Sequence, residues 1–556
     1  MKQSAPRIAP NWVVPALISV TLLFLLGLFS TEISDPDFWW HLKTGAYIAT
    51  QHRLPNPDPF AYTTAAAPAS PDELSIRTFN LTHEWLAQEA WYAIQHVGGW
   101  PAVVLWKALL MAALCVLTGW VVRRRTDSWM WAVAAALATA SLAVEFAHDR
   151  PAILTFVFTA AFIAIFEERR RLWWLPILAL IWANCHGGFF FAWIVCAAYS
   201  ADALVRRAPD ARRVLLVSGA VVLLTGLNPN GFAAVANVIR YRQSPLQSTL
   251  VEWSRPDLWG APYAFNVLLY ASALVVLISW KRVRLSDWIL FALFAAASLT
   301  AFRNELFIGM LAPILIASYW PWKRPLPSWA PVAASAVIAA ALVWGTARGA
   351  FFQLRAAEWR FPQGAAQFLS EHRISARVFN TYEYGGYLIW KGLPVFIDGR
   401  ALSESVFDDY RKILGAQPND PGPRQLLARY GVGVIVMNAF EYTSGAMYPL
   451  ALSLAQANQT EWKLVYEDPE SLVFVRDVPP GIGVLDSGRI VSHLEAECTL
   501  HVERDPEFSL CGRTLGNYFL RARDRERARR ALGLYLAHPY GEDPEARRAY
   551  LQLLGP

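Results

Sequence analysis

Charged residues are scarce in this 556-residue chain. Asp, Glu, Lys and Arg make up 17% of it, whereas an average soluble domain has about a quarter. Hydrophobic residues make up 55% and fall in blocks that stop near position 347. Each block is long enough, or nearly so, to cross a hydrocarbon core of about 30 Å. The composition therefore excludes an ordinary soluble protein and predicts a polytopic α-helical membrane protein.

Several signatures of soluble enzymes are also missing. The sequence has no Cys/His spacing typical of a metal site, no glycine-rich phosphate loop and no nucleophile elbow. These absences argue against an ATP-driven pump and a cytosolic nucleotide-sugar enzyme, and they favour a substrate that comes from or through the lipid bilayer. The net charge of +6 resides in short basic clusters between apolar blocks, so no nucleic-acid partner is predicted.

The hydropathy pattern predicts about eleven transmembrane helices. The candidate spans are 12–30, 102–122, 128–145, 152–166, 172–185, 188–205, 214–227, 264–280, 286–302, 305–320 and 328–347. Two spans separate each pair of consecutive basic clusters, which are Arg123–Arg125, Arg169–Arg171, Arg206–Arg213, Lys281–Arg284 and Lys323 with Arg324. With Lys2 and Arg7, these clusters predict a cytoplasmic N-terminus and a periplasmic C-terminal region, as expected for a multi-pass protein of the bacterial inner membrane.

This topology divides the chain into three parts. Residues 1–347 form the helical bundle with a long first outer loop at 31–99, residues 350–500 a soluble non-cytoplasmic α/β domain, and residues 501–556 a helical tail similar to a tetratricopeptide unit. Cys498 and Cys511 can form a disulfide if this region faces an oxidising compartment. The α/β domain is predicted from the segments Phe361–His372 (helix), Arg377–Tyr382, Pro394–Arg400 and Gly431–Met437 (strands), Gly385–Gly386 (turn), and Trp462–Tyr466 with Ser471–Arg476 (hairpin).

Ionisable side chains are concentrated in the segments predicted on the outer face. Such groups at membrane depth are costly and tend to mark a functional site. Asp35 and Asp37 follow the first span within a few residues, so each carboxylate is a candidate general base or ligand of a divalent cation. His41, in the same segment, is a candidate for substrate binding. The alternative interpretation is a helix-capping Asp-Pro-Asp turn beside an aromatic belt.

Other outer segments supply further candidates. His83 and Glu84 are candidate catalytic residues, or else they begin a capped interfacial helix. Asp149 and Arg150 open a span and are candidate phosphate-binding residues, or else they pair with each other. His186 precedes a Gly-Gly pair, where packing is the alternative to a role in the site.

Three more residues complete the set of candidates. Arg303 opens a span and is a candidate phosphate ligand, with a snorkelling anchor as the alternative. Asp398 and Arg400 end the predicted strand at 394–400. They are candidate substrate ligands because ligand groups often lie at the carboxyl ends of strands in α/β sheets.

The motifs resemble a known family. Five stretches carry the resemblance: Asp-Pro-Asp-x-Trp-Trp-His-x-x-x-Gly (35–45), Pro-x-x-Asp-Pro-Phe (55–60), His-Glu-Trp-Leu (83–86), Trp-x-Asn-x-His-Gly-Gly (182–188) and Gly-Gly-Tyr-Leu-x-Trp…Asp-Gly-Arg (385–400). With the acidic motif after the first span, the helical bundle and the outer soluble domain, the chain resembles the C-type glycosyltransferase superfamily, in an uncharacterised bacterial branch.

The resemblance implies an inverting transfer of a hexosyl or pentosyl group from a polyprenyl-phosphate sugar to a glycan, lipid or protein acceptor, in envelope glycan or glycoconjugate synthesis. Asp35 or Asp37 would deprotonate the acceptor hydroxyl, and Arg150, Arg303 and His186 would stabilise the departing phosphate. Some members of the superfamily use a divalent cation and many do not, so no cofactor is assigned. Two alternatives stay open, a transporter or flippase of a lipid-linked or anionic substrate and a non-catalytic envelope assembly protein.

Overall fold

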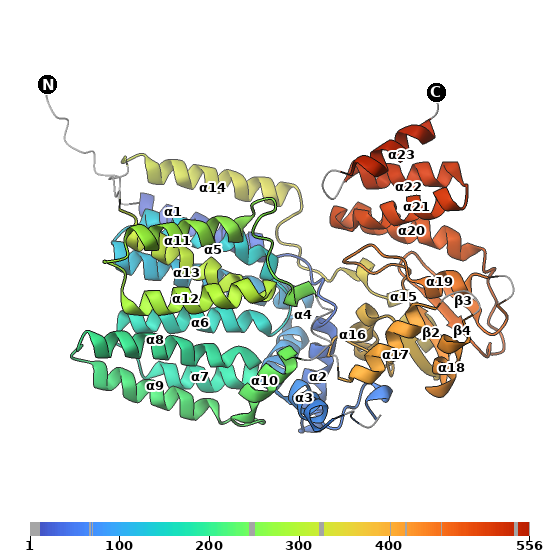
Figure 1. Ribbon diagram of the computed structural model, residues 1–556, viewed down its shortest axis with the longest axis horizontal. Helices are drawn as coiled ribbons and strands as arrows, with labels where there is room; N and C mark the ends of the chain where they lie inside the picture. The colour runs from blue at the N-terminus through green and yellow to red at the C-terminus, as the bar shows by residue number, and fades with distance from the viewer. Residues whose placement is uncertain are drawn as a thin grey trace. The chain divides into compact units, whose positions relative to one another are not determined.

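The computed structural model describes residues 12–554 except 66–67, 69, 244–250, 322–326, 401, 417–419, 457–458 and 539–542. The basic residues Lys2, Arg7, Lys323 and Arg324, which entered the topology prediction, lie outside the described residues. The chain forms two compact units (Figure 1). Unit 1 comprises residues 1–56 and 74–356, and unit 2 comprises residues 57–73 and 357–556.

Unit 1 is helical, and each of the eleven predicted spans coincides with a helix. These helices are α1 (Val13–Phe29), α4 (Trp85–Thr126), α5 (Trp129–Ala143), α6 (Ala152–Glu168), α7 (Trp174–Cys185), α8 (Phe191–Val205), α9 (Ala211–Thr225), α11 (Ala264–Ile278), α12 (Leu285–Thr300), α13 (Leu306–Tyr319) and α14 (Ala330–Ala347). Judged by length and composition, four helical stretches of the described chain can cross a bilayer, namely Pro71–Thr126, Trp129–Phe146, Gly187–Val205 and Ala330–Ala347. Four shorter helices, α1, α7, α11 and α12, are also apolar.

Three further helices, α2 (Phe38–Gln51), α3 (Pro71–Thr82) and α10 (Ala233–Gln243), come from predicted outer segments. Gly45 allows α2 to pack directly on α4, because a Cβ there would lie 2.1 Å from the carbonyl oxygen of Gln88. This close approach explains the glycine that ends the Asp35–Gly45 motif. Gly99, with φ of 63°, breaks α4 into an interfacial part and the predicted span, as expected for a conformation that glycine tolerates.

Two of the basic clusters meet at one end of the bundle. Arg125, at the end of α4, contacts Glu167 on α6 at 2.8 Å and Asp287 on α12 at 3.0 Å. Arg284 contacts the same Glu167 at 2.9 Å. Since Glu167 lies in the last turn of α6 and Arg150 precedes its start, the candidate residues at 149–150 lie at the opposite end of this helix. Along α6, a basic cluster therefore lies at one end and candidate-site residues lie at the other, as the charge pattern of the sequence predicts.

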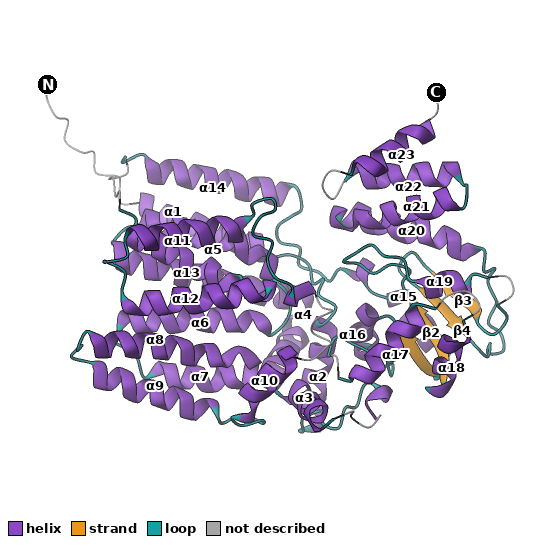
Figure 2. Ribbon diagram, in the orientation of Figure 1, coloured by secondary structure: helices purple, strands orange, loops and turns teal. Residues whose placement is uncertain are grey.

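Unit 2 contains a four-stranded mixed sheet of β1 (Arg377–Asn380), β2 (Val432–Met437), β3 (Lys463–Glu467) and β4 (Leu472–Val475) (Figure 2). The strand order is β1-β2-β4-β3, with β1 parallel to β2 and the other pairs antiparallel. The predicted hairpin is the β3–β4 pair. The helices of this unit are α15 (Gln363–Glu371), α16 (Tyr382–Trp390), α17 (Glu404–Leu414), α18 (Pro421–Arg429), α19 (Pro449–Leu454), α20 (Arg489–Arg504), α21 (Leu510–Arg521), α22 (Arg525–Ala537) and α23 (Pro544–Leu554).

Two local predictions for unit 2 are wrong. Gly385–Gly386 lies inside α16, where a Cβ on Gly385 would approach the carbonyl oxygen of Ile397 to 2.2 Å. The segment 394–400 is not a strand and, within the described part of the chain, makes a single bridge, between Val395 and Ala61. The Asn380 side chain satisfies its backbone instead, donating to the carbonyl of Ile397 at 2.8 Å and accepting from the N–H of Phe396 at 2.9 Å.

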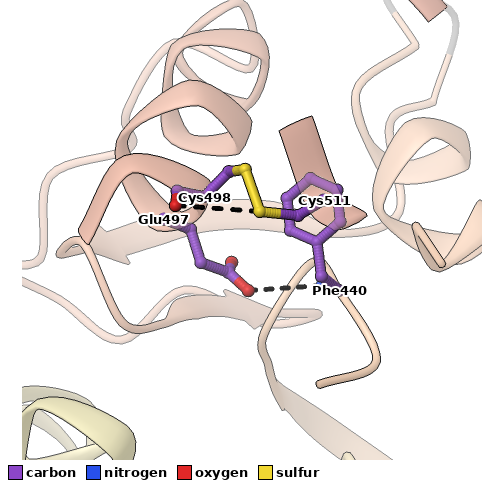
Figure 3. Close-up of a disulfide and its surroundings, with 4 residues drawn as sticks. All are labelled: Phe440, Glu497, Cys498 and Cys511. Atoms are coloured by element: carbon purple, nitrogen blue, oxygen red, sulfur yellow. Dashed lines mark hydrogen bonds between the residues drawn. A yellow bond between two sulfur atoms is a disulfide. The ribbon is translucent and has the colours of Figure 1, made fainter. Parts of the chain in front are cut away.

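Cys498 on α20 and Cys511 on α21 form a disulfide, a pairing that the sequence left open (Figure 3). Beside it, the buried Glu497 accepts hydrogen bonds from the backbone N–H groups of Ala439 and Phe440 at 2.8 and 3.2 Å. The disulfide therefore joins two tail helices at a point where one of them is also bonded to the segment that follows β2.

Candidate functional site

The Asp-Pro-Asp motif forms the turn between α1 and α2. The carboxylate of Asp35 accepts the backbone N–H of Asp37 at 2.9 Å, which is a local Asx-type turn. Asp37 is the N-cap residue of α2, yet its side chain makes no capping hydrogen bond. It accepts from the indole N–H of Trp40 at 3.0 Å instead. The helix-capping interpretation therefore fits Asp35 but leaves the carboxylate of Asp37 for another role.

Arg150 joins both carboxylates. Its Nε lies 2.8 Å from Oδ2 of Asp35, and its Nη1 lies 3.1 Å from Oδ2 of Asp37. Nη1 is also 3.7 Å from Oε2 of Glu252, whose other oxygen is 3.0 Å from Nη1 of Arg303. We call Asp35, Asp37, Arg150, Glu252 and Arg303 the carboxylate–arginine cluster. It brings together four segments of the chain that lie far apart in the sequence.

The two aspartates differ in exposure and acidity. The side chain of Asp35 is 2% exposed and that of Asp37 is 19% exposed. Burial opposes ionisation of Asp35, but the charges of Arg150 and His148 outweigh it and hold its pKa below the usual value. Burial, together with the neighbouring Asp35 charge, raises the pKa of Asp37 to about 7 despite Arg150. Asp35 is thus a permanent anion, whereas Asp37 is an accessible carboxyl poised to exchange a proton near neutral pH.

A second group of candidates surrounds Glu84. Its Oε1 lies 3.4 Å from Nε2 of His83 and 3.7 Å from Nε2 of His186, and its Oε2 lies 3.6 Å from Nδ1 of His41. We call these four residues the glutamate–histidine cluster. The start of α2 links the two clusters. His41 belongs to the glutamate–histidine cluster, and its backbone N–H donates to the carbonyl of Asp37, a member of the carboxylate–arginine cluster, at 3.2 Å.

The hydrogen bonds around the histidines assign their protons. Nδ1 of His186 accepts the N–H of Gly188 at 3.1 Å and lies 2.7 Å from the hydroxyl of Thr155, so its Nε2 carries the proton that faces Glu84. Burial lowers the pKa of His186 to about 3, which agrees with a neutral ring. His83 has one ring nitrogen 2.9 Å from the carbonyl of Phe79 and the other 3.4 Å from Glu84, so both nitrogens face acceptors.

The charges of this cluster favour an ionised Glu84. Burial opposes its ionisation, but the electrostatic interaction and hydrogen bond with His83 hold the pKa of Glu84 well below its usual value. Gly188 makes the arrangement possible, because a Cβ at this position would lie 2.5 Å from the Thr155 hydroxyl. The Gly-Gly pair therefore serves the close approach of the His186 turn to α6.

Asp149 and Arg150 do not pair with each other. Asp149 contacts Nζ of Lys107 on α4 at 3.0 Å, and both side chains are almost completely buried. Lys107 also donates to the carbonyl and hydroxyl oxygens of Thr31 at 3.0 and 3.1 Å. This contact fixes the backbone before α6 and directs the next residue, Arg150, toward the aspartates.

Asp398 and Arg400 lie in unit 2, where they form a buried ion-pair group with Asp58. Nε of Arg400 is 2.6 Å from Asp398, and Nη1 is 2.8 Å from Asp58. Asp58 in turn accepts the backbone N–H groups of Phe60 and Ala61. All three side chains are at most 3% exposed, so the group connects segment 57–64 to segment 394–400. A substrate role for this pair stays a prediction.

The carboxylate–arginine cluster does not suit a divalent cation as it stands. Hard divalent cations such as Mg²⁺ and Ca²⁺ bind oxygen ligands at about 2.0–2.6 Å, and those oxygens must be free of other close partners. Each of the six carboxylate oxygens of Asp35, Asp37 and Glu252 instead faces a nitrogen of the protein within 3.7 Å. Over the described part of the chain, three or more His, Cys, Asp or Glu side chains do not converge in a geometry that could hold a metal ion.

Three residues of this region were not among the sequence candidates. Glu252 bridges two arginines, Lys107 anchors Asp149, and the half-exposed His148 has Nδ1 3.8 Å from Asp35. His148 adjoins a candidate pair and Lys107 is a rare charge within a predicted span, so both carried a usable signal. Glu252 lies in a long outer loop without a motif, and only its acidic character marks it.

Comparison with known proteins supports the fold. No family model and no curated protein sequence matches the chain. Among solved structures, the chain is similar to the archaeal oligosaccharyltransferase AglB from Archaeoglobus fulgidus, described in complex with an inhibitory peptide and a dolichol-phosphate. The TM-score is 0.53 at 11% sequence identity, and the match covers 85% of this chain and 75% of that chain. This likeness shows that the chain shares its fold with that structure, as the sequence resemblance led us to expect.

Proposed function

We propose that the protein is a membrane-embedded inverting glycosyltransferase that uses a polyprenyl-phosphate sugar as donor. The observation that carries this proposal is the carboxylate–arginine cluster at the start of α2, where Arg150 lies between Asp35 and the more exposed Asp37. A base and a phosphate-binding cation side by side are what an inverting transfer requires. The shared fold with AglB, which was described in complex with a dolichol-phosphate, supports a lipid phosphate as part of the ligand.

Asp37 is the general base of the proposed reaction. Its carboxylate takes the proton of an acceptor hydroxyl while that oxygen forms a bond to the anomeric carbon. The bond from this carbon to the phosphate oxygen breaks, and the phosphate leaves with the electron pair, with inversion at carbon. A phosphate leaving group needs no proton, so a second carboxylic acid is not required.

The arginines and His186 serve the phosphate side. Arg150 and Arg303 are 27% exposed, so each keeps guanidinium N–H groups available beyond its contacts with carboxylates. Nε2 of His186 and Nε2 of His83 lie 3.7 and 3.4 Å from the same oxygen of Glu84, so this carboxylate would hold both rings in place. Asp35, almost fully buried, holds Arg150 in position and does not itself react.

We place the reaction on the periplasmic face of a bacterial inner membrane. The basic helix ends joined by Arg125 and Arg284 would then lie in the cytoplasm, in keeping with the positive-inside rule. The disulfide in unit 2 supports an oxidising compartment for that unit. The acceptor would be a glycan, lipid or protein that reaches this face.

The test uses the purified chain in detergent with a panel of polyprenyl-phosphate sugars, and it follows release of free polyprenyl phosphate. We expect Asp37→Asn to lower kcat by about 100-fold or more, the scale of a lost general base. Asp35→Asn should also lose activity through displacement of Arg150. Asp127→Asn is the matched control, because this aspartate is 92% exposed at the far end of α4. Equal release by wild type and Asp37→Asn would contradict the assignment, and a non-catalytic assembly protein would tolerate loss of both aspartates in cells.

A further inference from the structure

The centre of the carboxylate–arginine cluster is a fixed positive charge supplied by the chain. Arg150 contacts all three carboxylates through one guanidinium, at 2.8 Å to Asp35, 3.1 Å to Asp37 and 3.7 Å to Glu252. Carboxylates brought together from separate segments repel one another unless a cation lies between them. In a metalloenzyme that cation is a divalent metal ion, whereas here the guanidinium occupies the position between the carboxylates.

The remaining oxygens of these carboxylates are also engaged. Oδ1 of Asp35 accepts the N–H of Asp37, and Oδ1 of Asp37 accepts the indole N–H of Trp40. Oε1 of Glu252 accepts from Nη1 of Arg303 at 3.0 Å. A divalent cation would have to displace these donors and would also place two further positive charges beside Arg150, so the existing contacts disfavour it.

Arg150 cannot leave the cluster by a small movement of its backbone. It directly precedes Pro151, the N-cap residue of α6, and its carbonyl accepts the N–H of Ile153. The preceding residue, Asp149, is held by the buried contact with Lys107 at 3.0 Å. The guanidinium is thus delivered to the cluster by a rigid helix start, which is how a protein positions a charge that must not be lost.

We propose that Arg150 is the resident cation of this cluster and takes the place of a divalent metal ion. The wild-type protein then binds no divalent cation at these carboxylates, and removal of the guanidinium converts them into a divalent-cation site. The statement about cation binding is independent of the proposed reaction. Its consequence, a glycosyl transfer that needs no metal, rests on the proposed function.

Mn²⁺ binding to the purified full-length chain tests the proposal, because Mn²⁺ prefers carboxylate oxygen ligands and can be followed by electron paramagnetic resonance. We expect Arg150→Ala to bind one Mn²⁺ at least about tenfold more tightly than wild type, since three carboxylates lose their counter-charge. Adding Asp35→Asn to this variant should abolish the binding. Arg150→Lys keeps a positive charge, and Arg303→Ala leaves Arg150 in place. Both variants should bind Mn²⁺ no more tightly than wild type.

Thermal unfolding in the presence of Mn²⁺ gives a second measurement. The melting temperature of Arg150→Ala should rise with Mn²⁺ and that of wild type should not, because a cation that binds only the folded state stabilises it. Arg150→Gln, which keeps length and polarity, is measured in parallel. Mn²⁺ binding by wild type that is lost in Asp35→Asn would overturn the proposal. Absence of binding in both wild type and Arg150→Ala would overturn it as well, because the carboxylates would then not form a cation site.

An activity measurement separates this proposal from the proposed function. If a donor supports release of polyprenyl phosphate, the wild-type rate should be unchanged by a chelator such as EDTA. A chelator-sensitive rate restored by Mn²⁺ would contradict metal independence while leaving the glycosyltransferase assignment intact. If no donor is turned over, the proposed function fails, and the Mn²⁺ titrations still decide the role of Arg150.

Discussion

The indole N–H of Trp40 donates a hydrogen bond to Oδ1 of Asp37 at 3.0 Å, from one turn further along α2. The bond fixes the carboxylate at the helix start and leaves Oδ2 toward Arg150. It also favours the ionised form and therefore lowers the pKa of Asp37 against the effect of burial. Trp40 is accordingly a positioning residue for the proposed base.

Replacement of this indole tests that role. We expect Trp40→Phe to lower kcat by about 10- to 100-fold with little change in KM, because a misplaced base costs rate rather than substrate binding. The acidic limb of the pH–rate profile should also move to higher pH, since the variant lacks the hydrogen bond to the carboxylate. Trp39→Phe is the matched control, because Trp39 packs against Phe38 and Trp100. A loss of rate without a pH shift would indicate packing alone.

The pKa of Asp37 predicts the pH dependence of the wild type. Burial, with the charge of Asp35 and a weaker effect of Glu252, raises this pKa to about 7, while Arg150 and the Trp40 hydrogen bond oppose the rise. A base works when deprotonated, so kcat/KM should increase from pH 6 to pH 8 and then level. The profile is measured by release of polyprenyl phosphate. Asp37→Asn should lose this limb, and a flat wild-type profile across the range would contradict the assignment of Asp37 as base.

Much of this site could be predicted from the sequence because burial of apolar helices determines where their ends lie. Asp35, Asp37, Arg150 and Arg303 were found as ionisable residues beside predicted spans, and the structure brings them together. Their partners could not be assigned in the same way. Asp149 and Arg150 are neighbours in sequence, yet Lys107 takes the first and the aspartates take the second. The side chains of consecutive residues at a helix start point in different directions. Which partner each side chain meets depends on the packing between helices.

The same limit explains the errors in unit 2. The apolar segment 394–400 has the pattern of a buried strand, but its polar backbone atoms are satisfied by Asn380 and by the hydroxyl of Thr63, which donates to the carbonyl of Phe396 at 2.6 Å. Periodicity reports burial and not the identity of the hydrogen-bond partner. A segment from 57–64 cannot be placed against 394–400 from one sequence without knowledge of this long-range contact.

The disulfide should contribute measurably to the stability of unit 2. Cys498 and Cys511 are separated by 13 residues and are both buried. Removal of a cross-link of this size costs about 3 kcal/mol in the chain-entropy treatment. We therefore expect Cys498→Ala with Cys511→Ala to lower the melting temperature of this unit in detergent, and dithiothreitol to lower that of wild type but not of the double variant. Cys115→Ala, which removes a free buried thiol, should keep the response to dithiothreitol.

The pKa of Glu383 predicts how the stability of unit 2 depends on pH. Its Oε1 accepts a hydrogen bond from the hydroxyl of Tyr448 at 2.8 Å, and its Oε2 is buried with no hydrogen-bond partner among the residues that the structure describes. Burial, with the charges of Glu441 and Glu497, raises the pKa of Glu383 to about 7 from 4.5. The folded state therefore binds the proton more tightly than the unfolded state, and the resulting stability is complete below pH 4.5 and is lost as the pH rises through about 7.

Glu383→Gln keeps a neutral side chain at every pH and should remove this dependence. Because a pKa unit corresponds to about 1.4 kcal/mol, the variant should exceed wild type in unfolding free energy by at most about 3 kcal/mol at pH 8, and the two should converge near pH 4. Thermal melts of the full chain across this range provide the measurement. Glu371→Gln, at an exposed acid on α15, is the matched control and should follow wild type. A difference in unfolding free energy between Glu383→Gln and wild type that stays constant from pH 4 to pH 8 would contradict this prediction. It would show that the pKa of Glu383 is the same in the folded and unfolded states.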